Sequence, residues 1–206
     1  MDAYTAEHED ALREITNVGM GRAGAALASV LREYVTLAVP GVEIIRADQV
    51  VDCILGMEQA ETGGVEAAVV VRQGFSGGAS GEALVVFGRG GANALADRLG
   101  HDAVDSEAIE QEILLDTTNL ITGAVLRAMG EQLGMGFIPT APSLYARGEG
   151  IASELAPHAI SWEHALLVAV NFRVEQRDFR CHLALLFPEQ AIGQIRRALD
   201  HLLEAL

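Results

Sequence analysis

The 206-residue chain has few cysteines, few basic residues and no long hydrophobic run. Its two cysteines, Cys53 and Cys181, form no CxxC pair, so neither a disulfide framework nor a thiolate metal site is expected. Lys and Arg total 14 against 29 Asp and Glu, which gives a formal net charge of -15. Phosphate groups would repel such a chain, so we predict no nucleic-acid partner and no binding to anionic membrane surfaces.

The most apolar windows, residues 165–170 and 183–187, have the length of strands and are too short to span a bilayer. The first fifteen residues have no basic region leading into an apolar run, so no signal peptide is expected. We therefore predict a cytoplasmic protein without membrane insertion. With half of its residues hydrophobic, the chain can bury a sizeable core.

The order of predicted elements occurs twice along the chain, which is the most informative feature of the sequence. Helical spacing over residues 7–33 and 106–133 predicts one long helix in each half. After each helix the sequence predicts an extended run with proline, a pair of β-like runs and a further helix. These later elements are residues 35–45, 65–72, 82–87 and 91–99 in the first half, and the run with Pro139 and Pro142, 165–175, 179–187 and 189–206 in the second. We predict one α/β domain over residues 1–206 made of two repeats, about 1–100 and 106–206. Two long helices would pack on a mainly antiparallel sheet, related by pseudo-twofold symmetry.

In the first predicted helix, Asp10, Glu14 and Asn17 stand at positions i, i+4 and i+7 and therefore share one face. That face continues to Gly21, which has no side chain to obstruct an approaching partner. Pro40 follows Asn17 by 23 positions.

The second predicted helix has Glu112, Asp116, Asn119 and Gly123 at the same relative positions, and Pro142 again follows the asparagine by 23. On either helix alone, acids and amides on one face are usually only a solvated surface. An asparagine inside a helix is mildly unfavourable, because its side chain competes for backbone hydrogen bonds. Its recurrence at the same register favours a functional interpretation.

The pattern of an acidic or serine residue, three positions, Glu, two positions, Asn, 22 positions and Pro resembles the active-site signature of the CheC/CheX/FliY family of CheY-P phosphatases. The first copy, from Asp10 to Pro40, matches in full, and the second, from Glu112 to Pro142, matches in spacing with two substitutions. Two copies within about 200 residues resemble the two-site form of CheC, and the resemblance covers essentially the whole chain.

The resemblance implies that the chain hydrolyses the aspartyl phosphate of a CheY-like receiver, which carries its own Mg²⁺. Asn17 and Asn119 would orient the attacking water, because an amide can both donate and accept hydrogen bonds. Glu14 and Asp116 would pair with the receiver's active-site lysine. The supporting motif residues are Asp10, Pro40, Glu112 and Pro142. No cofactor of its own is expected.

Asp116 is one methylene shorter than glutamate, so its lysine contact is either stretched or requires a closer approach. The resemblance also implies CheD as a possible partner, with the short helix 91–99 as a candidate contact. In an alternative interpretation, the chain is a non-catalytic adaptor that binds receivers or CheD.

Two other patterns in the sequence resemble known motifs but lack the context that those motifs require. Residues 19–24 spell GxGxxG, with Glu43 as a candidate ribose-binding acid, but a dinucleotide site needs a strand before the glycines. Residues 74–78 fit GxSxG, which belongs between a strand and a helix, whereas the next run here reads as a strand, so we expect these glycines to form the turn of a hairpin. The six histidines show no HxH or HExxH spacing, so no metal site is proposed, and Trp162 is expected to be a packing residue.

Overall fold

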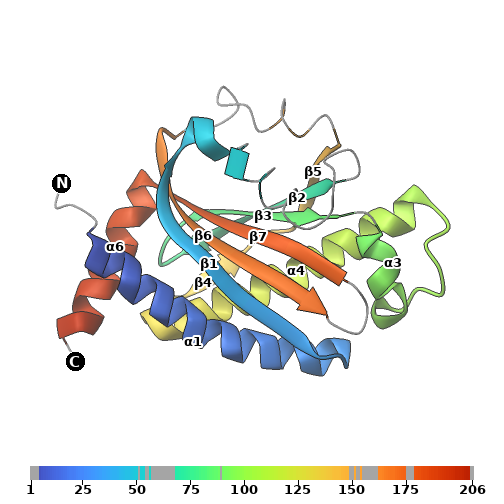
Figure 1. The fold of residues 1–206 in the computed structure, drawn as a ribbon, viewed down its shortest axis with the longest axis horizontal. Helices are drawn as coiled ribbons and strands as arrows, with labels where there is room; N and C mark the ends of the chain where they lie inside the picture. Colours follow the sequence, from blue (N-terminus) through green and yellow to red (C-terminus); the bar gives the residue numbers. More distant parts are fainter. Residues whose placement is uncertain are drawn as a thin grey trace.

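The computed structural model describes residues 5–50, 52–53, 56, 68–88, 90–148, 151, 154, 162–174 and 179–204 (Figure 1). Helices and strands follow one another in the order that the sequence predicts, with two long helices of similar length. The elements are α1 (Ala6–Leu31), β1 (Val35–Arg46), η1 (Ala47–Gln49), β2 (Val69–Gly77), β3 (Gly81–Phe87), α3 (Gly91–Leu95), η3 (Ala96–Leu99), α4 (Glu107–Leu133), β4 (Phe137–Pro139), β5 (Ser143–Arg147), β6 (His164–Val174), β7 (Phe179–Pro188) and α6 (Glu189–Glu204). Residues 65–67, 175 and 205–206 of the predicted elements lie outside the described residues.

Both long helices begin at a side-chain cap and end where the backbone turns left-handed. The Thr5 hydroxyl accepts from the backbone N–H of His8, whose ring accepts from the Thr5 N–H at 3.0 Å. Ser106 caps α4 by accepting from the backbone N–H of Ile109. Arg32 has φ of 52°, so α1 ends two residues before the predicted boundary, and Gly134 ends α4 with φ of 63°.

The seven strands form one sheet in the order β1-β6-β7-β3-β2-β4, with β5 also paired to β2, and every pairing is antiparallel. This confirms the predicted fold class. The hairpins β2–β3 and β6–β7 meet at the centre through β3 and β7. The first half of the chain supplies β1 to the edge of the second half's hairpin, and β4 and β5 pair in return with β2. Neither half could therefore complete its part of the sheet alone.

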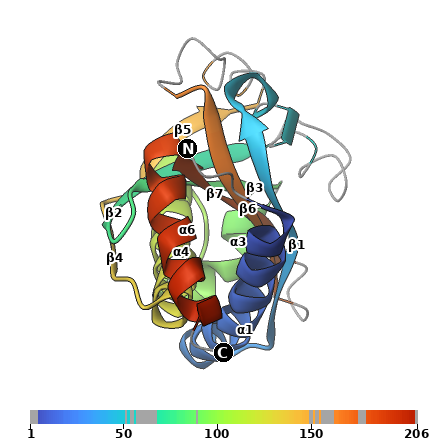
Figure 2. The same cartoon turned by 90° about the vertical axis from the view of Figure 1, so that its left-hand side faces the viewer.

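Successive residues of the central strands alternate between two apolar layers. One layer lies under α1, α4 and α6, which Figures 1 and 2 show on the same side of the sheet. Its strand residues are Val69, Val71, Phe75, Ala83, Val85, Phe87, Leu166, Val168, Val170, Leu183, Leu185 and Phe187. A smaller cluster covers the other face around Val70, Leu84 and Leu186, and the half-buried Trp162 packs against it, as predicted.

Helices α1 and α4 run in opposite directions and pack closely (Figure 1). A Cβ placed at Gly19 would lie 3.2 Å from the backbone of Ala128, so the small residue is what allows the two helix backbones to approach. Arg22 and Glu131 form an exposed ion pair of 3.5 Å across the same contact. Exposed pairs of this kind contribute little, so apolar packing holds the helices together.

The glycine-containing patterns have the structural explanations that the sequence favoured. Residues 19–24 lie inside α1 and are preceded by its helical residues 6–18, so the dinucleotide fingerprint lacks the strand that it requires directly before the glycines. Residues 74–78 belong to the β2–β3 hairpin. Strand β2, however, ends five residues later than predicted: residues 74–77, which the glycines assign to a turn, are extended because they pair with β3 and β4. None of the described helices is long and apolar enough to cross a membrane.

The end of α4 allows a test of this packing. At Gly130 a Cβ would lie 2.4 Å from the carbonyl oxygen of Met135, whereas at Gly123 of the same helix it would meet no atom within 4 Å. We expect Gly130→Ala to destabilise the protein by about 1–3 kcal/mol, because backbone must move to make room. Gly123→Ala should be neutral or stabilising by up to about 1 kcal/mol, through helix propensity. Urea unfolding of both variants measures the difference; equal stabilities would contradict the packing at Gly130.

Candidate functional site

The predicted site residues of the first helix lie on the exposed surface of α1. The side chains of Asp10, Glu14 and Asn17 are all exposed, one or two helical turns apart. At Gly21, the next residue on the same face of the helix, a Cβ would meet no atom within 4 Å. We call such a row of an acid, a carboxylate, an asparagine and a glycine on one helix face a stripe. The asparagine and its neighbouring carboxylate are therefore open to a partner molecule.

Helix α4 repeats this arrangement. Glu112, Asp116 and Asn119 are exposed, and the space around Gly123 is open. The model thus presents two stripes of the same kind on two antiparallel helices that are packed against each other. The catalytic roles of these residues remain predictions from the sequence.

A buried threonine directly precedes each asparagine. The hydroxyl of Thr16 donates to the carbonyl of Leu12 at 2.6 Å, and that of Thr118 donates to the carbonyl of Leu114 at 2.8 Å. Both threonines are fully buried, so these bonds satisfy hydroxyls that would otherwise be costly to bury. A buried residue next to each asparagine helps to fix which way the helix faces. The sequence carries the signal as a Thr-Asn dipeptide in both helices, which motif spacing alone overlooks.

The carboxylates near the asparagines have no hydrogen-bond or ion-pair partner among the described residues. Neither Glu14 nor Asp116 makes a hydrogen bond or ion pair with another described residue. Asp10, by contrast, accepts from Arg13 at 3.0 Å. Glu14 and Asp116 are therefore free to pair with a cation that a partner brings.

The two asparagines differ in their hydrogen bonds to the rest of the protein. The side-chain oxygen of Asn119 accepts a hydrogen bond from Nε2 of Gln73 at 2.9 Å, and the same nitrogen donates to the carbonyl of Thr140 at 2.7 Å. Gln73 lies on β2 and is fully buried. Asn17 makes no hydrogen bond with any residue that the structure describes. Sequence analysis missed Gln73, although it shares a strand face with Val69 and Val71 and is the polar exception there.

The motif prolines lie where the edge strands are interrupted. Pro40 falls at the register shift of β1 between Ala38 and Gly41, and Pro142 lies between β4 and β5. Proline has no backbone N–H and is tolerated at such breaks. The recurring distance of 23 positions from asparagine to proline therefore joins a helix position to a break in the adjoining edge strand.

A groove of about 400 Å³ runs between the two helices and reaches Asn119. Small side chains form much of its wall, and arginine and glutamate stand among them. The lining residues are Arg22, Ala23, Ala26, Leu27, Val30, Asn119, Leu120, Gly123, Ala124, Arg127, Ala128 and Glu131. The groove is continuous with the second stripe.

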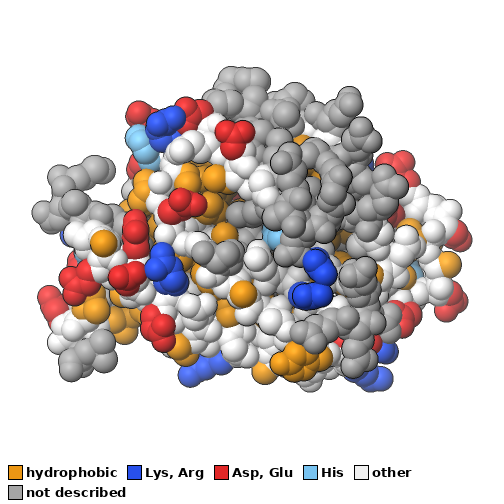
Figure 3. Space-filling model, in the orientation of Figure 1, with side chains coloured by type: hydrophobic (Ala, Val, Ile, Leu, Met, Phe, Trp, Pro, Cys, Tyr) orange, Lys and Arg blue, Asp and Glu red, His pale blue; other side chains and the backbone are white. Residues whose placement is uncertain are grey.

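Acidic side chains gather at the left-hand end of the molecule, where α1 begins beside α6 (Figure 3). The first turns of α1 and α4 both carry acids, Glu7 and Glu9 in one helix and Glu107 and Glu110 in the other. These negative charges stabilise the positive ends of the helix dipoles. They also show that a local surplus of carboxylates has a structural reason at both helix starts.

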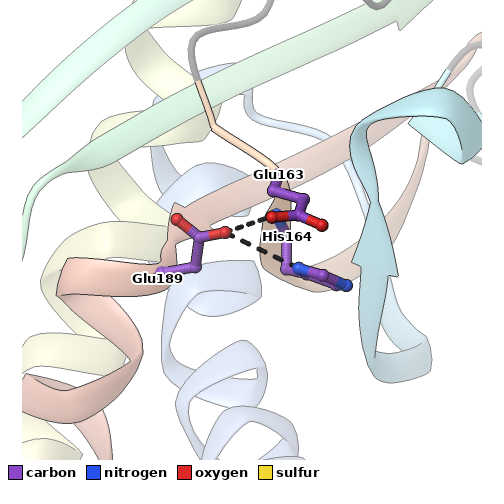
Figure 4. Close-up of side chains that lie close together, drawn as sticks. All are labelled: Glu163, His164 and Glu189. Atoms are coloured by element: carbon purple, nitrogen blue, oxygen red, sulfur yellow. Dashed lines mark hydrogen bonds and ion pairs between the residues drawn. The ribbon is translucent and has the colours of Figure 1, made fainter.

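Potential metal ligands come together once among the described residues, in Glu163, His164 and Glu189 (Figure 4). Their donor atoms lie within 4.8 Å of one another at the junction of β6 and α6. One oxygen of Glu189 accepts from the backbone N–H of His164 at 2.8 Å and lies 3.6 Å from its Nδ1. This hydrogen bond joins the start of α6 to β6, which accounts for the glutamate without a metal ion.

The two cysteines are free thiols outside the stripes. Cys181 is fully buried in β7, and burial raises the pKa of its thiol well above the usual range. The pKa of the half-buried Cys53 is also raised, chiefly by burial. Thiolate chemistry is therefore disfavoured at both positions.

Comparison with known proteins agrees with the family resemblance that the two motifs indicate. The chain is 24% identical over 195 residues to the CheY-P phosphatase CheC of Bacillus subtilis (strain 168), covering 87% of this chain and 88% of that protein. No protein-family model matches the chain.

Solved structures share the fold over nearly the whole chain. FliY of Thermotoga maritima has a TM-score of 0.71 at 16% identity and is matched over 97% of this chain and 98% of its own. FliM of H. pylori, in a complex with SpeE, has a TM-score of 0.62 at 16% identity, over 97% of both chains. CheX of Desulfovibrio desulfuricans has a TM-score of 0.52 at 19% identity, over 84% of this chain and 99% of its own. These likenesses, together with the CheC relative, confirm the resemblance to the CheC/CheX/FliY family of chemotaxis proteins.

Proposed function

We propose that the protein is a phosphatase that hydrolyses the aspartyl phosphate of a CheY-like receiver in chemotaxis signalling. The observation that carries the proposal is the pair of exposed stripes, each with an asparagine, an unpaired carboxylate and an open glycine position. The likeness to the CheY-P phosphatase CheC supports the choice of substrate.

In the proposed reaction, Asn17 or Asn119 holds a water molecule in line with the phosphorus atom. A bond forms between the water oxygen and phosphorus as the bond from phosphorus to the aspartate oxygen breaks, which releases phosphate and a free carboxylate. An amide contributes by position and not by acid or base strength, which suits a reaction in which proteins act mainly by positioning and electrostatics. Both asparagines are exposed, as insertion into a partner's site requires.

Glu14 and Asp116 would pair with the lysine of the receiver's active site and so set the register of docking. That role is supported by the finding that neither carboxylate pairs with another residue in the described ranges. Glu112 and Asp10 would only support the site, and Asp10 is already paired with Arg13. The Mg²⁺ of the reaction would belong to the receiver, and the protein would act in the cytoplasm without a cofactor of its own.

A second candidate function is a non-catalytic adaptor that binds receivers or CheD. FliM of H. pylori, which shares this fold, forms a complex with SpeE, and this supports a binding role for the architecture. Helix α3 with η3 is the proposed CheD contact. The two functions differ in whether the asparagines are needed for phosphate release.

We expect wild-type protein to accelerate phosphate loss from a phosphorylated CheY-type receiver in the presence of Mg²⁺. Asn17→Ala and Asn119→Ala should each lower kcat, and the double variant should lose the acceleration, by about 100-fold or more, because the water is no longer positioned. Phosphate release under multiple turnover measures the rates. Binding of the receiver without any acceleration by wild type would favour the adaptor instead.

The length of the acidic side chain offers a matched pair of variants. In an Asn17→Ala background, Asp116→Glu should lower KM for the phosphorylated receiver about threefold or more, since the longer side chain reaches the lysine more easily. In an Asn119→Ala background, Glu14→Asp should raise KM by a similar factor. Unchanged KM in both variants would contradict the lysine contact.

The chain contains no lysine, since all 14 of its basic residues other than histidine are arginine. A carbodiimide that joins carboxylates to amines should therefore couple Glu14 or Asp116 to the receiver's lysine without competition from side-chain amines of this chain. Peptide mass spectrometry should find these two cross-links, and Glu14→Gln with Asp116→Asn should remove them. Cross-links confined to other carboxylates would show a different docking register. The result does not depend on catalysis.

A further inference from the structure

We propose that Gln73 is the positioning residue of the second site: it holds the carboxamide of Asn119 in one orientation and thereby sets turnover there. The inference rests on the proposed function. It begins from the two hydrogen bonds that Nε2 of Gln73 donates, to the Thr140 carbonyl at 2.7 Å and to the Asn119 side-chain oxygen at 2.9 Å.

These two bonds determine which way the Asn119 amide faces. The backbone carbonyl of Thr140 can only accept a hydrogen bond, so Gln73 must turn its NH₂ group toward it. The second N–H of that group then meets Asn119, which must present its oxygen. The NH₂ group of Asn119 is left away from Gln73, on an exposed side chain. The protein itself thus selects one of the two amide orientations.

Gln73 can do this because its own position is fixed. It is fully buried in β2, in phase with the apolar residues Val71 and Phe75 of the helix-covered face. Strand β3 pairs with it at Ala83 on one side. On the other side it lies opposite the break between β4 and β5, where Thr140 leaves the strand and offers its carbonyl. A rigid strand, not a loop, therefore carries the group that orients the asparagine.

Among the residues that the structure describes, the first site has no such residue. Strand β1 is broken at Pro40, between Ala38, which pairs with Asn171, and Gly41, which pairs with Ala169. The β6 residue opposite this break is Val170, which is fully buried and apolar. Val170 can neither donate nor accept a side-chain hydrogen bond. The two sites therefore have similar exposed residues, but within the described part of the chain only Asn119 is held by a buried side chain.

A neutral, similarly sized variant separates the two sites. Gln73→Met keeps an unbranched side chain of comparable length but removes both hydrogen bonds. We expect it to lower kcat of the second site, isolated by Asn17→Ala, by about ten- to a hundredfold, with KM changed by less than about twofold. KM should persist because the carboxylate of Asp116 is untouched. In the Asn119→Ala background, which isolates the first site, the same variant should leave both parameters unchanged.

The first-site measurement also shows that Gln73→Met is folded. An unchanged kcat at the second site would overturn the proposal, and so would an equal fall at both sites, because the latter indicates general damage. A fall in kcat confined to the second site supports it.

A spectroscopic readout separates this inference from the proposed function. The side-chain NH₂ signals of Asn119 in a ¹⁵N-correlation spectrum are assigned by their loss in Asn119→Ala, and those of Asn17 likewise. Gln73→Met should shift the Asn119 signals and leave those of Asn17 in place. If neither the wild type nor any variant accelerates phosphate release but the Asn119 signals still shift, the proposed phosphatase function is wrong while the orientation of Asn119 by Gln73 stands. If Asn119 does not shift, the orientation itself is wrong.

Discussion

The close packing of α1 against α4 on the apolar face of the sheet is the constraint on which the site depends. Gly19 of α1 lies against the Ala128 backbone of α4, and the inner residues of both helices are buried against the sheet. With their inner faces fixed in this way, the opposite faces are turned to solvent. The threonines beside the asparagines bury their hydroxyls by bonding back along the helix, so a polar residue is accommodated without disturbing that packing. The exposure of the two stripes therefore follows from the burial of the opposite faces of α1 and α4 against the sheet.

The sequence could predict the stripes because the helix period relates residues that are close along the chain. It could likewise predict an antiparallel sheet from the paired β-like runs, and it identified residues 74–78 as part of a hairpin. It misjudged the end of β2, because glycines that usually mark a turn stay extended when they pair with a neighbouring strand, as Gly74 does with β3 and Gly77 with β4.

Gln73 could not be found by the same reasoning. It lies 46 positions from Asn119 in the sequence, and the corresponding place opposite the other strand break is held by Val170. Comparing the two halves highlights what they share, so a residue that distinguishes them is passed over. A polar residue in phase with Val69, Val71 and Phe75 was the available sign, but its partner depends on tertiary contacts. The side-chain oxygen of Gln73 has no hydrogen-bond partner among the described residues. An unpaired buried group costs about 1–3 kcal/mol, and such a cost is typical of positions kept for function.

The broken edge strands have a consequence for how the protein behaves at high concentration. A long, regular edge strand offers a row of unpaired backbone groups on which another molecule can add a strand. Strand β1 forms one edge of this sheet, and Pro40 removes an N–H and shifts the register in its middle. The opposite edge is divided into the short strands β4 and β5, with Pro142 between them. The two prolines that mark the spacing of the motif thus also make both edges poor templates for intermolecular β-pairing, so the same residues protect the chain from aggregation.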